Sequence, residues 1–249
     1  MQTTIQYNSR KLQIDLSQPL DISIPLRSSK LNVNAWLEEE PKIEPVQIED
    51  WIGSVSEGAS VNFNNIQFNP HAHGTHTECV GHITKGFYSV NKNLTQFFFL
   101  AEVISVAPEQ NGEDTVISKK QLQFALGNKK REAIILRTLP NMKDKLSKQY
   151  SNTNWTYLEE EAVEYLVSKD IKHLLIDLPS VDKEKDGGEL KAHKAFWNFK
   201  GKYRTDCTIT EMIYVPNHVE DGEYLLNLQI APFENDASPS KPILYKVQD

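Results

Sequence analysis

The sequence predicts an α/β fold, a single β-rich domain in which a mixed sheet is flanked by a few helices. Apolar segments of strand length outnumber helical patterns, and several of these segments are apolar on both faces, as buried strands are. Strands and helices also do not alternate in the regular order of a doubly wound sheet. Because the chain has no internal repeat or Gly/Ser-rich linker, residues 1–249 are expected to form one domain.

The expected strands are segments rich in β-branched and aromatic residues that lie between turn signals. They fall within residues 11–26, 60–69, 97–106, 133–138, 173–180, 224–233 and 242–247. The acidic, proline-containing stretch 38–50 between the first two is expected to be a loop.

Three segments have helical patterns. Residues 118–127 begin with Ser118 and Gln121 in capping-box spacing and end at a glycine. Residues 156–170 repeat that spacing with Thr156 and Glu159, which predicts a helix starting after Thr156. Residues 189–199 would place His193 and Trp197 on one helix face.

Composition narrows the class of function. The net charge of −7, from 27 basic and 34 acidic residues, argues against a nucleic-acid partner and favours a small-molecule substrate. No signal-like segment opens the chain, and the longest apolar run, which begins at Phe97, is too short to span a membrane and contains Glu102. Cys79 and Cys207 cannot form a disulfide framework. We therefore expect a cytoplasmic protein without a membrane partner.

The stretch "NPHAHGTHTECVGH" (69–82) contains four of the seven histidines. Residues two apart in a strand point to the same side, so His76 and Glu78 can reach one metal ion together. Nearby glycines would let the chain bend and bring in His71, His73 or His82. Mixed imidazole and carboxylate ligands suit zinc, manganese or iron(II). A packed core would gain nothing from so many polar groups, so the stretch predicts a metal site.

Several kinds of metal protein are compatible with such a site. A nucleobase-type zinc deaminase is excluded because it needs Pro-Cys-x-x-Cys, and the two cysteines here lie far apart. A non-haem iron oxygenase could use His76, Glu78 and His193. A non-catalytic metal- or ligand-binding protein of the same fold is also possible. A metal-dependent hydrolase accounts for most of the histidines, as ligands of one or two ions and as acid/base groups.

At "HGTHTECVGH" the sequence resembles the metal-dependent cyclase family, which includes kynurenine formamidase and isatin hydrolase and has the signature His-x-Gly-Thr-His-x-Asp-x-Pro-x-His. Weaker similarities are "IDLSQPL", "AIILRTLP", "LIDLPSVD" and the C-terminal "LLNLQIAPFENDASPSKPIL". The resemblance implies that His76 is a metal ligand, that Glu78 stands at the aspartate position and that His82 is the final histidine. It also places His193 and Glu211 at the active site.

The sequence departs from the signature at three positions. Ala72 stands where the first histidine is expected, so either His71 or His73 would take its place, with His71 favoured. Glu78 replaces aspartate, and Val80 replaces proline.

The resemblance implies hydrolysis of an amide, formamide or lactam-like C–N bond by a homodimer or higher homo-oligomer. The cofactor would be one or two divalent ions, zinc or manganese. The expected ligands are His71, His73, His76, Glu78, His82, His193 and Glu211. Of these, His82, His193 and Glu211 are also expected to supply acid/base catalysis.

Some further polar residues have more than one interpretation. Asp177, Ser180 and Asp182 would either line the pocket or end a strand. His173 and His218 are expected at the surface or at strand ends.

Overall fold

The computed structural model describes residues 1–248, and its central feature is a ring of seven strands. In order round the ring these are β8 (His76–Glu78), β17 (Ala237–Gln248), β16 (Gly222–Ile230), β9 (Phe98–Val106), β12 (Ala133–Thr138), β14 (His173–Ile176) and β15 (Thr208–Glu211). Strand β15 pairs with β8 and closes the ring. Strands β9, β12, β14 and β15 are parallel to one another, whereas the other pairs are antiparallel. The sheet is therefore mixed, as predicted.

Strand β12 illustrates how the ring is stabilised. All six of its residues are buried. Ile134 and Leu136 belong to the apolar cluster that includes the helices, whereas Ala133 and Ile135 belong to the cluster on the other face of the sheet. Successive side chains of a strand point to opposite faces. Burial on both faces therefore explains why 133–136 is a continuous apolar run.

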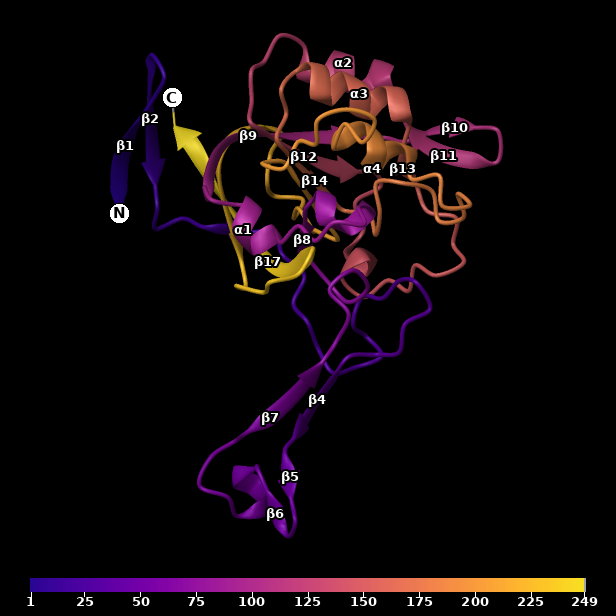
Figure 1. The fold of residues 1–249 in the computed structure, drawn as a ribbon. Helices are drawn as coiled ribbons and strands as arrows, with labels where there is room; N and C mark the ends of the chain where they lie inside the picture. Colours follow the sequence, from indigo (N-terminus) through magenta and orange to yellow (C-terminus); the bar gives the residue numbers. More distant parts are fainter. Residues whose placement is uncertain (249) are drawn as a thin grey trace.

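Three helices, α2 (Lys119–Leu126), α3 (Glu160–Ser168) and α4 (Lys191–Phe196), lie together beside the parallel strands (Figure 1). The predicted capping box of α2 is confirmed: the Ser118 side chain accepts a hydrogen bond from the Gln121 backbone, and the Gln121 side chain accepts one from Ser118. The predicted cap at Thr156 is wrong. The next two residues form strand β13 (Tyr157–Leu158), which pairs with β11 (Asp114–Ile117), so α3 begins only after Glu159.

Several short elements surround the ring. They are β1 (Gln2–Tyr7), β2 (Arg10–Asp15), β3 (Leu20–Asp21), β10 (Glu109–Asn111), α1 (Val90–Asn93) and the 3-10 helices η2 (Val80–Ile83) and η3 (Lys143–Leu146). Within residues 1–248, no helix has the length and apolar character needed to cross a membrane.

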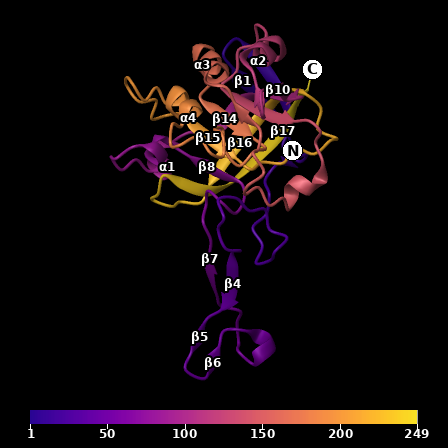
Figure 2. The ribbon, with the colours of Figure 1, turned by 90° about the vertical axis from the view of Figure 1, so that its right-hand side faces the viewer.

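Residues 42–67, which we call the arm, extend away from the ring in both views (Figures 1 and 2). The arm contains β4 (Lys42–Pro45), β5 (Gln47–Ile48), β6 (Trp51–Ile52), η1 (Val55–Glu57) and β7 (Asn64–Gln67). Strand β4 pairs with β7, and β5 pairs with β6. The prediction of a loop over 38–50 was therefore wrong at Lys42–Pro45 and Gln47–Ile48, which are strands. The strand predicted within 60–69 is present, but all of β7 is exposed.

Candidate metal centre

The strand β8 lies between β15 and β17 and carries the centre of the histidine-rich stretch. His76 and Glu78 are both fully buried and point to the same side, as their spacing predicted. On the opposite side, the Thr77 hydroxyl lies 2.7 Å from the Thr210 hydroxyl of β15. The pairing of β8 with β15 places Glu211 opposite His76. The sheet therefore holds three of the predicted site residues on a hydrogen-bonded backbone.

His76 presents a lone pair to a carboxylate. Its Nδ1 lies 3.0 Å from the Gly74 carbonyl oxygen, which can only accept a hydrogen bond, so Nδ1 carries the proton of the neutral ring. The other nitrogen, Nε2, is buried without a hydrogen-bond partner and lies 3.4 Å from Glu211 Oε2. Two acceptors that face each other in a buried site are unfavourable unless a proton or a metal ion lies between them. A divalent ion fits this requirement.

His193 is arranged in a similar way. Asp182 Oδ2 lies 2.6 Å from His193 Nδ1 and accepts its proton in a hydrogen bond, which directs Nε2 toward Glu78 Oε1 at 3.0 Å. The Asp182 carboxylate also accepts hydrogen bonds from the backbone of Ala192 and His193, so it fixes the start of α4 together with the ring. A carboxylate behind a histidine is the usual support of a metal-binding imidazole.

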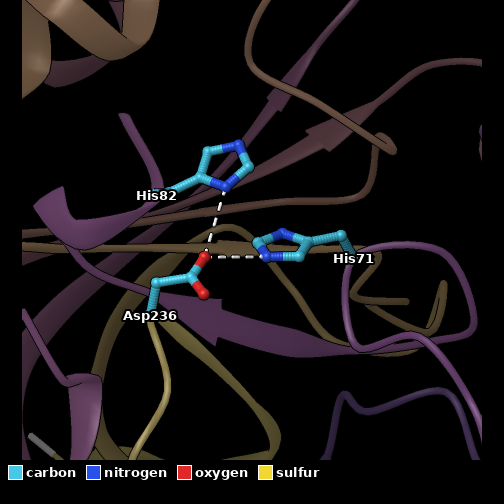
Figure 3. A group of neighbouring side chains, drawn as sticks. All are labelled: His71, His82 and Asp236. Atoms are coloured by element: carbon cyan, nitrogen blue, oxygen red, sulfur yellow. Dashed lines mark hydrogen bonds and ion pairs between the residues drawn. The ribbon is translucent and has the colours of Figure 1, made fainter. Parts of the chain in front are cut away.

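His71, His82 and Asp236 form the more exposed part of the centre (Figure 3). Asp236 Oδ2 lies 3.0 Å from His71 Nε2 and 3.4 Å from His82 Nδ1, and the two rings are stacked with centroids 4.3 Å apart. Glycine at position 81 lets the Tyr88 backbone pack close beside this group, because a Cβ there would lie 2.2 Å from the Tyr88 carbonyl oxygen. His82 lies within η2 and is exposed.

The structure separates His73 from these residues. Of the described side chains that come close enough to share an ion, three groups emerge, and none includes His73: His71, His76 and Glu78; Glu78, His82 and His193; and His71, His82 and Asp236. The His73 ring is buried elsewhere and accepts a hydrogen bond from the Asn69 backbone at 2.8 Å. Its burial lowers the pKa of the ring. The first ligand position is thus open to His71, the residue favoured from the sequence.

Without an ion, interactions between protonated histidines and the neighbouring carboxylates stabilise the cluster. Burial opposes the charged form of His193, but Asp182 and Glu78 outweigh it and raise the pKa of this ring well above its usual value. Burial likewise opposes charge on Glu78, whereas the histidines His82, His193 and His71 hold its pKa well below the usual range. The pKa of His71 is raised to about 10, because Asp236 and Glu78 outweigh its burial. An ion bound here would displace these protons.

The other polar residues singled out in the sequence lie outside the three groups. Asp177 forms a buried ion pair with Lys145, with Nζ and Oδ2 2.7 Å apart. Ser180 accepts a hydrogen bond from the backbone of Asp182. His173 is the first residue of β14, so it lies at a strand end, one of the two expected positions, and its side chain is buried. His218 is exposed, as expected.

Asp236 was not identified from the sequence. It lies in a loop 165 residues from His71, among other polar residues and without a distinctive motif. The only available signal was that the surrounding segment resembled the closing strand of the cyclase family.

Known proteins are similar to this chain in sequence and in structure. The Cyclase family model matches residues 14–183. The chain is 28% identical over 231 residues to a kynurenine formamidase of Bacillus cereus, a match that covers 92% of this chain and 97% of the relative.

Two solved structures share the fold. An isatin hydrolase bound to the product analogue thioisatinate has a TM-score of 0.69 at 15% identity, and the match covers 93% of each chain. A structure described as a potential metal-dependent hydrolase with cyclase activity has a TM-score of 0.67 at 16% identity, covering 93% of this chain and 99% of the other.

Proposed function

The chain belongs to the Cyclase family, and we propose that it is a metal-dependent hydrolase that cleaves an amide, formamide or lactam-like C–N bond in a small molecule. The observation that carries this proposal is the buried Nε2 of His76, which faces Glu211 with no proton donor between them. The names of the relatives, kynurenine formamidase and isatin hydrolase, support the reaction class.

The proposed ligands are His71, His76, Glu78 and His193, which belong to the three groups described above, for one or two ions of zinc or manganese. Glu211 lies outside the groups and is added because its Oε2 is 3.4 Å from His76 Nε2. Glu78 links the two sides of the proposed site, since it contacts His71 and His193 through different oxygens. A divalent ion bound there would activate a water molecule and polarise the carbonyl group of the substrate.

His82 is the proposed proton carrier. Its ring is the most exposed in the cluster and lies 5.3 Å from the His193 ring, between centroids. His82 takes a proton from the attacking water as the water oxygen bonds to the carbonyl carbon. The same ring then gives that proton to the leaving nitrogen as the C–N bond breaks, so the protons balance within one turnover.

The test is metal content by elemental analysis of the purified protein, beside His76→Ala and a control variant, His218→Ala. We expect about one to two equivalents of zinc or manganese. The metal should be lost in His76→Ala and retained in His218→Ala, and the loaded protein should hydrolyse N-formyl or cyclic amides. A folded protein that takes up no metal after reconstitution would refute the proposal. Bound iron together with oxygen consumption would favour an oxygenase. Bound metal without hydrolysis of any amide would favour a non-catalytic binding protein.

We also propose that the protein is a homodimer or higher homo-oligomer, with the arm at the contact. The arm exposes large apolar side chains, among them Ile48, Val55, Val61, Phe63 and Ile66, each more than half exposed. A two-stranded hairpin is marginally stable alone, and exposed apolar groups of this kind mark interaction surfaces. Sedimentation velocity should detect a species larger than 28.5 kDa, and Phe63→Asp should shift it toward the monomer. A wild-type protein that sediments as a monomer would contradict this proposal.

A further inference from the structure

His71 and His82 both contact the same carboxylate oxygen, Asp236 Oδ2 (Figure 3). This shared contact determines which nitrogen of each imidazole carries the proton. His71 has a carboxylate on each side: Asp236 Oδ2 is 3.0 Å from Nε2, and Glu78 Oε2 is 3.1 Å from Nδ1. The contact with Asp236 has hydrogen-bond geometry, whereas Glu78 Oε2 has no hydrogen-bond partner. A neutral His71 therefore carries its proton on Nε2 and leaves the lone pair of Nδ1 directed at Glu78.

The same oxygen orients His82. Asp236 Oδ2 lies 3.4 Å from Nδ1 of that ring, so a neutral His82 carries its proton on Nδ1 and leaves Nε2 free. The two stacked rings thus expose opposite nitrogens because they donate to one acceptor. His71 offers Nδ1 to the buried cluster, and His82 keeps Nε2 for proton transfer.

The backbone holds Asp236 rigidly in this position. Its carbonyl accepts a hydrogen bond from the Cys79 backbone at 3.0 Å, and its neighbour Ala237 pairs with Glu78 in the sheet. A Cβ on Gly81 would lie 3.1 Å from the Asp236 Cβ, so a larger residue there would crowd the carboxylate. The loop is therefore fixed to the same strand that carries the proposed ligands.

We propose that Asp236 is a positioning residue, which selects Nδ1 of His71 as the metal-binding nitrogen and Nε2 of His82 as the proton acceptor. This inference rests on the proposed metal site. It explains how a histidine one position earlier than the family signature supplies the first ligand: Ala72 occupies the expected position and is buried, while the carboxylate turns the His71 ring inward.

The test uses zinc alone as the probe, titrated into metal-free protein against a chromophoric chelator. Asp236→Ala should weaken zinc binding about 10- to 100-fold, the usual effect of removing the carboxylate behind a metal-binding histidine. Asp236→Asn keeps an acceptor oxygen and the side-chain shape, so it should lose less. Glu234→Ala, two residues away on an exposed side chain paired with Lys92, is the matched control and should bind zinc like the wild type.

A second readout reports the rings directly. In two-bond ¹H–¹⁵N spectra of zinc-loaded, histidine-labelled protein, His71 should show one state protonated on Nε2, and Asp236→Ala should lose that single state. Wild-type affinity together with an unchanged His71 signal in both Asp236 variants would overturn this role while leaving the metal site intact. A wild-type protein that binds no zinc would overturn both, so the two failures can be told apart.

Discussion

The contact between Asp182 and His193 allows a prediction with a definite magnitude. The substitution Asp182→Asn keeps the size of the side chain and an oxygen that can accept from the backbone of Ala192, so α4 should still form. It removes the negative charge 2.6 Å from His193 Nδ1. Loss of such a supporting carboxylate weakens metal binding about 10- to 100-fold, or about 1.4–2.7 kcal/mol. We expect a loss of zinc affinity in that range.

The pH dependence of the metal-free protein gives a second measure of the same contact. The pKa of His193 is raised in the folded state, so its contribution to stability is complete below the usual histidine pKa of about 6.5 and is lost as the pH rises through the folded value. Asp182→Asn should reduce this contribution. Urea unfolding in the presence of a chelator, at several pH values from 6 upward, would therefore show a flatter profile for the variant.

Asp206→Asn is the matched control, since its carboxylate is exposed and forms an ion pair with Lys172 at the surface. It should bind zinc like the wild type and unfold with the same pH profile. Zinc affinity of Asp182→Asn within twofold of the control, with α4 intact, would refute the reasoning. In that case Asp182 would have a role only in capping α4.

Three other predictions follow from the structure. Zinc at 100 times its dissociation constant should raise the free energy of unfolding by about 2.7 kcal/mol, an effect that His76→Ala should abolish in urea titrations. Burial lowers the pKa of His173 to about 3, so the unfolded chain takes up a proton first and stability falls between pH 6.5 and 3; His173→Gln should reduce this loss in acid titrations. Gly81→Ala should cost about 1–3 kcal/mol, measured by thermal unfolding, because its Cβ would clash with Tyr88.

Each of these has a clear contrary result. Zinc that stabilises His76→Ala as much as the wild type would place the ion elsewhere. An unchanged acid profile in His173→Gln would assign the acid sensitivity to other groups. A Gly81→Ala variant as stable as the wild type would mean that the backbone at Tyr88 can move away.

Much of the fold could be predicted because the ring strands are buried on both faces. Residues 98–106 and 133–138 are almost wholly buried, and such strands appear in a sequence as continuous apolar runs. The pairing of His76 with Glu78 could also be predicted from the sequence, since strand spacing alone places both side chains on one side. Strand β4 of the arm was not predicted because it is largely exposed and carries charged residues and a proline, which in a sequence resemble a loop.

The rest of the site depends on contacts between distant segments. Which of His71 and His73 joins the cluster depends on contacts with Glu78 and Asp236, and residue types alone do not specify these contacts. Asp236 joins the cluster only because β17 pairs with β8, a pairing of strands about 160 residues apart that no local pattern encodes.

The closed ring also determines how the site can come apart. Strand β8 has only three residues, yet it has a neighbour on each side and so has no free edge from which to fray. Its amide groups can exchange with solvent only when the link between β15 and β17 breaks. Hydrogen exchange at His76, Thr77 and Glu78 should therefore report opening of the whole ring, with a free energy close to that of global unfolding. For this protein, assembly of the metal-binding residues and completion of folding would then be one cooperative event.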